Sequence, residues 1–233
     1  MLRDNFWLDG IDAASKGIVL QKEIEFEAAE PVLETIKVPG RDGSILYYDG
    51  SYKDVRGTAK CYVLSPDAAL SITEVNSWLL SSTGYRRLQT MHEPQFYRLA
   101  RITKGARLEP RLNLLAPFDI ELICKPYKFY LSGEEAVTFS SSGSLLGPTD
   151  FPSLPLITVS GSSSGTVTIN GSTLTLTDSN GITLDCETKD AYKGTTNKNS
   201  TVSGTYPTLG RDNTIAFTGG VTSVAITPRW RTI

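Results

Sequence analysis

The stretch 37–55, KVPGRDGSILYYDGSYKDV, carries residue types that could hold a phosphate group or a metal ion. It contains two Asp-Gly pairs, Asp42-Gly43 and Asp49-Gly50. A phosphate loop ends in Gly-Lys-Ser/Thr, whose lysine and hydroxyl meet the phosphates and magnesium, and this ending is missing. The Asp-x-Asp-x-Asp-Gly oxygens of a calcium loop are missing too. The pattern therefore favours turns, because Asp-Gly is common turn chemistry.

Catalytic and metal-binding side chains are scarce. His92 is the only histidine, so a histidine-based triad or an imidazole metal site would have to use this one side chain. Its neighbour Pro94 favours a surface or loop position. Cys61, Cys124 and Cys186 lie far apart in strand-like runs, which predicts reduced, buried thiols rather than disulfides or zinc ligands. We predict no catalytic residue, no metal site and no cofactor.

Acidic and aromatic residues leave weaker candidates. A pair of carboxylates for glycoside cleavage needs only proximity in space, so the 25 acidic residues leave that class open. Asp185 could be a site carboxylate, although an acid satisfied in a turn or at a strand edge is the preferred interpretation. Trp230 and Tyr206 are candidate contacts for a glycan or a protein partner. For Trp230 we favour packing into its own domain, since the alternating run VTSVAITP precedes it.

Charge and hydropathy exclude two further classes. The formal net charge is -2, and no apolar run reaches a membrane span, so neither specific nucleic-acid recognition nor membrane insertion is predicted. Aspartates near the N-terminus argue against a signal peptide, and the scattered cysteines favour a protein made in a cytoplasm. A locally basic run includes Phe96 and Tyr97, but ordinary solvated strands show the same mixture. Its cations are Arg86, Arg87, Arg98, Arg101, Lys104, Arg107 and Arg111.

The elements that must position these residues divide into two halves. Residues 1–133 hold most of the charged side chains, and residues 151–233 are dominated by Ser, Thr and Gly. Between them, the small residues, glycines and prolines of 134–150 are typical of an exposed connection. We therefore predict two domains joined by a linker.

The first domain is predicted to be strands with one helix. The Ser-Pro-Asp sequence at 65–67 offers an N-cap, and Ile72, Val75 and Leu79 then share one helical face, which predicts a helix over 66–81. Asp-Gly at 49–50 predicts a two-residue hairpin turn. The predicted strands are 17–26, 32–38, 44–48, 57–64 and 118–124, and in the last one apolar and polar residues alternate.

The second half is predicted to be a β-sandwich. The run 165–176 is a hairpin around Asn170-Gly171, a pair that tolerates the positive φ of a type I′ turn. The segments GITLDCET, NTIAFTGG and VTSVAITPRWR follow as short strands, without a second helix signal. The fold class is therefore mainly β.

Taken in order, these segments resemble a known family. VPGRDGSILYYDGSYKDV, a capped helix ending in WLLSSTGYRRL and then EPQFYRLARI are similar to the N-terminal domain of the distal tail proteins of long-tailed, non-contractile bacteriophages. LDCETKDAY, YPTLGRDNTIAFTG and VAITPRWR are similar to the C-terminal part of that family. The usual linker signature is weakly represented by GPTDFPSLPLITV. The likeness spans almost the whole chain.

The resemblance implies a non-enzymatic structural protein at the virion tail tip, or baseplate. It implies an N-terminal β-sandwich or split-barrel-like domain with one helix and an extended hairpin, which forms a hexameric ring around the DNA channel. The ring would join the major tail tube protein to the tail hub protein. The C-terminal domain would be a galectin-like β-sandwich that in some members docks a receptor-binding protein.

Two other functions stay open on the sequence. One is a carbohydrate-binding module or a tail-fibre, receptor-binding protein, whose sandwich would bind host glycans through exposed aromatic side chains. The other is a cell-wall hydrolase with two unidentified carboxylates. Exposed aromatic side chains distinguish the first from a purely structural role, and beyond Phe139 the second half offers only Phe151, Tyr192, Tyr206, Phe217 and Trp230.

Overall fold

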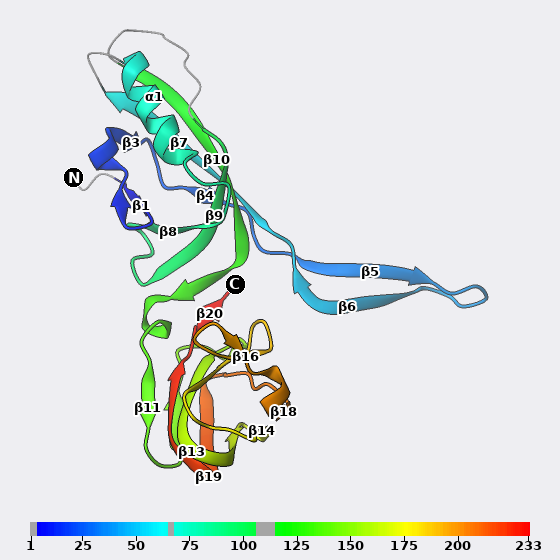
Figure 1. The fold of residues 1–233 in the computed structure, drawn as a ribbon. Coiled ribbons are helices and arrows are strands. Elements are labelled where there is room, and N and C mark those ends of the chain that lie inside the picture. The colour runs from blue at the N-terminus through cyan, green and yellow to red at the C-terminus, as the bar shows by residue number, and fades with distance from the viewer. Residues whose placement is uncertain (1–3, 65–67, 106–114) are drawn as a thin grey trace. The chain divides into compact units, whose positions relative to one another are not determined.

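The computed structural model describes residues 4–64, 68–105 and 115–233 (Figure 1). The chain forms two compact units, residues 1–128 with Ile233 and residues 129–232. Each unit contains its own core of buried apolar side chains. Whether the two units fold independently stays a prediction. Across the described residues, no helix has both the length and the apolar character that a membrane crossing requires.

The first unit is built on one curled antiparallel sheet that carries helix α1 (Ala68–Leu79). The helix confirms the prediction for this segment: Ile72, Val75 and Leu79 are buried in the core of the unit, while the expected cap at 65–67 lies outside the described residues. The strands run in the order β2 (Ile11–Asp12), β1 (Phe6–Leu8), β8 (Arg86–Thr90), β9 (Phe96–Lys104), β10 (Leu115–Tyr130), β7 (Val55–Leu64) and β3 (Ile18–Leu20), with β4 (Glu25–Phe26) also beside β7.

The long pair β7 and β10 forms the spine of this sheet. Its alternation is as predicted, since Phe118 and Ile120 are buried and Asp119 between them is exposed. Gly57 lies where β7 crosses the side chains of β10, and a Cβ at this position would come within 2.2 Å of Leu122 Cδ1. The predicted strand 17–26 is instead the two short strands β3 and β4, which pair with different parts of β7.

The second unit is a two-layered β-sandwich made from one long bent ribbon. Strands β13 (Leu156–Ile169) and β19 (Asp212–Thr227) pair along their whole length, with register shifts at 160–165. Because strands bend at such bulges, the two halves of the ribbon can join opposite layers. One half pairs with β15 (Ile182–Asp185), and the other with β14 (Ser172–Leu176). The segments NTIAFTGG and VTSVAITP are therefore one strand, not two as predicted.

The remaining strands of the second unit are short. Asn170 and Gly171 have φ angles of 51° and 81° at the β13–β14 turn, which agrees with the predicted hairpin. The other elements are η2 (Leu131–Gly133), β11 (Val137–Phe139), β12 (Gly143–Leu146), β16 (Asp190–Lys193), β17 (Thr196–Asn197), η3 (Asn199–Thr201), β18 (Val202–Gly204) and β20 (Arg231–Thr232).

The segment expected to be a linker takes part in the sandwich. β11 and β12 lie within 134–150, and both pair with β19. The serines at 140–142 lie in the bend between these two strands, so the small residues mark a short turn inside the sandwich, whose composition is the same as that of a linker. The composition therefore placed the second unit too late, since it begins at residue 129.

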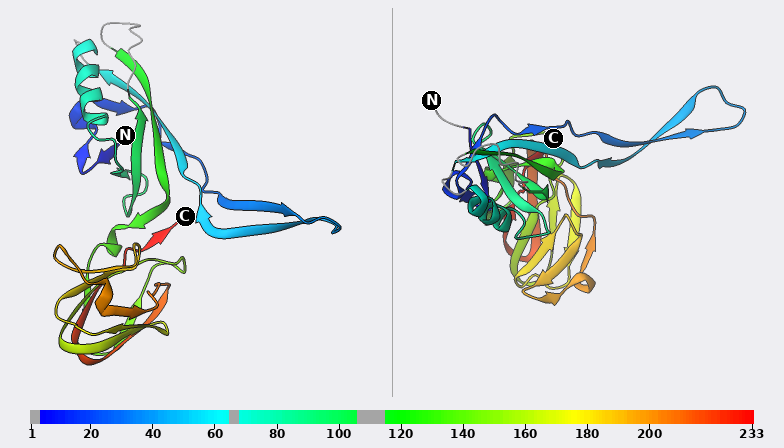
Figure 2. Two further views of the ribbon diagram at one scale, coloured as in Figure 1. Left: turned by 45° about the vertical axis from the view of Figure 1, so that its right-hand side comes forward. Right: turned by 90° about the horizontal axis from the view of Figure 1, so that it is seen from above.

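A two-stranded hairpin, β5 (Pro31–Lys37) and β6 (Ser44–Tyr52), extends from the first unit as a separate sheet (Figures 1 and 2). Its turn contains the first Asp-Gly pair, with φ angles of 79° at Gly40 and 78° at Gly43. The turn predicted at Asp49-Gly50 is wrong, since this pair lies within β6, where the register with β5 shifts. Gly50 has φ 89°, which a bulge and a turn both require, so the dipeptide cannot distinguish them.

Candidate functional site

The hairpin β5–β6 exposes apolar side chains on a scale that a free protein surface rarely shows. Patches of this kind mark interaction sites, because apolar surface in water is unfavourable. The exposed fractions range from 37 % for Val32 to 62 % for Leu46. The other large apolar side chains in this set are Leu33, Ile36, Val38, Ile45, Tyr47 and Tyr48.

Both faces of the hairpin are apolar. Directly opposite residues of an antiparallel pair share a face, and faces alternate along each strand. The register pairs Leu33 with Tyr48 and Thr35 with Leu46 on one face. On the other face it pairs Glu34 with Tyr47 and Ile36 with Ile45. The hairpin therefore has no wholly polar face of the kind that a half-buried strand presents to solvent.

The hairpin by itself is expected to be only marginally stable. A two-stranded sheet is marginally stable in water unless another element covers it. Among the described residues, β5 and β6 pair only with each other, so both outer edges present backbone N–H and C=O groups to solvent. Covering by a partner would bury the apolar faces and satisfy these edges.

An aromatic contact fixes the root of the hairpin to the sheet of the first unit, and charged contacts join the two sides of the root to each other. The rings of Tyr48, Tyr52 and Tyr127 form an edge-to-face series, with centroids 6.0 Å and 6.2 Å apart. The hydrogen bond with Tyr52 raises the pKa of Tyr48 to about 12. Lys53 Nζ lies 3.0 Å from Glu30 Oε2, and Lys53 N donates to Glu30 O across the two strands. The arm is therefore anchored where it leaves the sheet.

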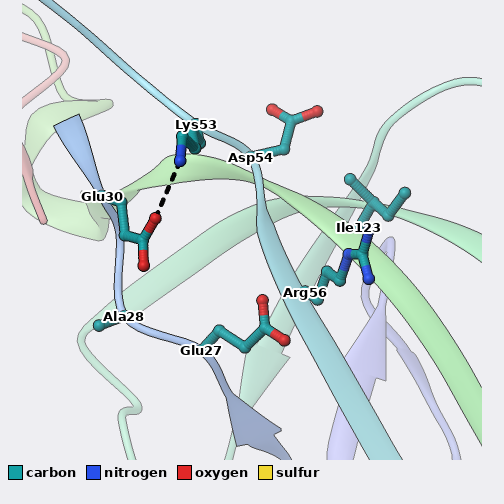
Figure 3. A pocket seen from close by; sticks show the side chains of 7 residues that line it. All are labelled: Glu27, Ala28, Glu30, Lys53, Asp54, Arg56 and Ile123. Carbon is teal, nitrogen blue, oxygen red and sulfur yellow. Dashed lines mark hydrogen bonds and ion pairs between the residues drawn. The ribbon is translucent and has the colours of Figure 1, made fainter. Parts of the chain in front are cut away.

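A charged hollow of about 600 Å³ lies at this root (Figure 3). Its polar lining comes from the strand segments on either side of the hairpin, and Ala28 and Ile123 add apolar surface. Three carboxylates and two cations line it: Glu27, Glu30, Asp54, Lys53 and Arg56. The root therefore has a mixed-charge, slightly acidic cavity next to the apolar arm.

Trp230 and Tyr206 do not form an exposed aromatic platform. Trp230 is 4 % exposed and belongs to the core of the second unit, against which Tyr206 also packs in a partly buried position. The Trp230 ring lies over Gly147, where a Cβ would come within 2.8 Å of the ring. A buried indole offers no face to a sugar, so the candidate glycan contact at Trp230 is corrected to a packing position.

Asp185 is part of a structural ion pair. Arg229 Nη1 and Nη2 donate to its two carboxylate oxygens at 2.8 Å and 3.1 Å, and Glu187 N donates at 2.9 Å. Burial opposes ionisation, but the hydrogen bonds from Arg229 and Glu187 outweigh it and lower the pKa of Asp185. The carboxylate is therefore already satisfied, as the preferred sequence interpretation expects.

This pair makes the second unit sensitive to acid. A carboxyl group whose pKa is lowered by folding stabilises the protein above its unfolded pKa of about 4, and the stabilisation is lost as the pH falls. We expect Asp185→Asn to lower the free energy of unfolding at pH 7 by about 1–3 kcal/mol. Below pH 3 the difference from the parent should shrink. Urea unfolding across pH 2–7 measures this, with Asp150→Asn, at an exposed pair, as the control. An undiminished difference at low pH would contradict the assignment.

Several side chains of the basic run at residues 86–111 make contacts within the first unit. Arg86 is 7 % exposed, pairs with Asp9 at 2.6 Å and donates to the carbonyl oxygen of Trp78 at the end of α1. The guanidinium groups of Arg87 and Arg98 lie over aromatic rings, at 4.2 Å and 4.4 Å. Arg107 and Arg111 lie outside the described residues.

The remaining candidates for chemistry have structural surroundings. All three cysteines are free and buried. Burial raises the pKa of Cys61 and Cys186 to about 12 and that of Cys124 to about 11, which disfavours the reactive thiolate. His92 Nε2 lies 2.9 Å from Asp4 Oδ1 at the surface. Within the described ranges, no group of three His, Cys, Asp or Glu side chains is placed to hold a metal ion.

Comparison with known proteins identifies the fold. By sequence, the chain matches no family model and no characterised protein. By structure, it is similar to the Dit protein (gp 19.1) of phage SPP1, described as a paradigm of the hub adsorption apparatus in phages that infect Gram-positive bacteria. The TM-score is 0.72 at 12% sequence identity, and the match covers 99% of each chain.

A second solved structure is similar over nearly the same length. It is a chain of the phage p2 baseplate in its activated conformation, with a TM-score of 0.50, 12% identity and coverage of 96% of this chain and 97% of that one. The mainly β fold class is confirmed, and so, at the level of the fold, is the resemblance to distal tail proteins.

Proposed function

We propose that this chain is a structural component of a bacteriophage tail tip, where six copies assemble into a ring. The observation that carries the proposal is the fold similarity to SPP1 Dit over 99% of both chains, which includes both units. The exposed hairpin β5–β6 supports it independently, because its two apolar faces require a partner. The second neighbour comes from a phage baseplate, which fits the same location.

In this proposal the hairpin supplies the main contact between copies. A closed ring needs a head-to-tail interface, in which one patch meets a different patch on the next copy. An arm that carries apolar side chains away from its own sheet can reach such a patch. The ring would join the tail tube to the tail hub and leave a channel for DNA. The second unit would offer its surface to a receptor-binding protein.

The proposed role is structural and requires no catalysis. The side chains with catalytic potential serve other purposes: Asp185 pairs with Arg229, His92 lies near Asp4, and the cysteine pKa values are raised by burial. A carbohydrate-binding role for the second unit receives less support, since its candidate platform residue Trp230 is buried.

The ring is the direct test of the proposed function. Because mass action makes assembly depend on concentration, we expect the full-length protein to be a monomer when dilute and a ring when concentrated or mixed with tail tube and hub proteins. Each interface should bury more than about 1,000 Å². Light scattering gives the mass and negative-stain imaging gives the symmetry. A chain that stays monomeric at high concentration with both partners present would refute the proposal.

A further inference from the structure

We propose that the hairpin tip of one copy docks into the charged hollow at the hairpin root of the next copy. The inference rests on the proposed function and deepens it, because it names the two patches of the head-to-tail interface. The tip is the loop 38–43 together with Lys37 and Ser44, the strand residues on either side of it. The root is the hollow lined by Glu27, Asp54 and Arg56, beside the Glu30–Lys53 pair (Figure 3).

The tip carries two positive charges and one negative charge. Lys37, Arg41 and Asp42 are all exposed, and none of them has an ion-pair partner among the described residues. Gly40 and Gly43, both in the left-handed region, close the loop tightly. The result is a narrow, cationic end on an apolar arm.

The root carries the complementary set, two negative charges and one positive charge. Within the described residues, the side chains of Glu27 and Arg56 have no ion-pair partner, and Asp54 accepts only a long 3.4 Å bond from Tyr85 Oη. Glu30 and Lys53 neutralise each other at the rim. In the docked pair, the acids Glu27 and Asp54 of the root would face the two cations of the tip. Arg56 of the root would face Asp42 of the tip.

The two patches cannot meet within one copy. They lie at opposite ends of the same two strands, and the seven residues of β5 span about 23 Å at roughly 3.3 Å per residue. In the proposed contact their charges are paired between copies. A tip that meets a different patch on its neighbour is a heterologous contact, which closes into a ring when the rotation between copies allows it. The apolar strands supply affinity, and the charge pattern fixes register and direction.

The experiment is a charge exchange between the two patches in the full-length protein. Lys37→Glu with Arg41→Glu reverses the tip, and Glu27→Lys with Asp54→Lys reverses the root. Because like charges placed together cost several kcal/mol, each double variant should raise the concentration at which rings form by at least about 10-fold. Lys189→Glu with Lys193→Glu, at exposed positions of the second unit, makes the same charge change as the tip variant and should leave assembly unchanged. Circular dichroism melting checks that every variant is folded.

Mixing the two variants gives the decisive result. In an equimolar mixture every interface can be complementary if the copies alternate, as an even-numbered ring permits, so ring formation should return to the parental concentration. Parental assembly by both separate variants would overturn the tip-to-root contact and leave the ring intact. Failure of the mixture to recover would also overturn it, because the charges would then face another surface. If the parent forms no ring under any condition, the proposed function fails together with this inference.

Discussion

Replacing apolar residues on either face of the hairpin should weaken ring assembly strongly and leave the fold unchanged. We expect this of Leu33→Ser with Leu46→Ser on one face, and of Ile36→Ser with Ile45→Ser on the other. Full burial of a large apolar side chain is worth about 1.5–3 kcal/mol, and these side chains are already about half buried in the free chain, so assembly gains about half of that value for each. Two lost per copy should therefore raise the assembly concentration by at least about 10-fold. Light scattering over a dilution series measures this concentration.

The same substitutions should hardly affect the stability of the monomer. These side chains are 39–62 % exposed in the free chain, and surface substitutions usually change the free energy of unfolding by less than about 0.5 kcal/mol. Leu146→Ser is the matched control, because this leucine is 74 % exposed but lies on β12 in the second unit. It should assemble like the parent.

The two face variants also distinguish between modes of covering. If only one of them prevents assembly, the hairpin lies with its other face in solvent, as a half-covered strand does. If both prevent it, the arm is enclosed on both sides. Rings from both variants at the parental concentration would show that the hairpin is not the assembly surface.

The parts of the fold that sequence predicts well are those where one local rule acts alone. The helix at 68–79 follows from apolar residues on one face, and the turn at Asn170-Gly171 follows from two residues that accept positive φ. The alternation around Phe118 follows from a sheet with one buried face. In each case the segment and its own unit contain all the interactions that decide the structure.

The misjudged parts are those where one residue pattern serves two structures. Asp49-Gly50 sits at a bulge rather than a turn, and Gly219, with φ 73°, lies within β19 rather than between two strands. Both geometries need the same left-handed backbone, so the type of residue cannot separate them. In the segment 134–150, likewise, the serines lie in a turn between two strands that pair with β19, and not in a linker.

The candidate site shows a different limit. The run of β-formers in β6 predicts a strand, but an apolar residue on a strand says nothing about whether its covering surface belongs to the same chain. Leu46 is 62 % exposed, and this can be known only from the three-dimensional structure, which shows that no other part of the described chain covers it. The charge pattern of tip and root also becomes meaningful only when the hairpin separates Arg41 from Glu27 in space.

Trp230→Ala should cost about 3–5 kcal/mol of unfolding free energy, because it removes a large buried side chain and leaves a cavity. The side chain of Trp230 is 4 % exposed. The backbone carbonyl of Trp230 accepts a hydrogen bond from Tyr130 N, next to the pairing of β20 with β10. Gly147 and Gly133 lie so close to Trp230 that a Cβ at either would clash. Neighbours held this closely cannot move in to fill the space, which favours the upper part of the range.

Urea unfolding with intrinsic fluorescence or circular dichroism measures this loss, and Tyr47→Ala is the control. Tyr47 is 54 % exposed, so its removal should change the free energy of unfolding by less than about 0.5 kcal/mol. Binding to bacterial cells is measured alongside stability on the same proteins. A Trp230→Ala protein that unfolds like the parent but no longer binds cells would mean that the indole contacts a glycan. The packing against Gly147 predicts the other outcome. The Trp230→Ala protein should be less stable than the parent, and the fraction that is folded should still bind cells.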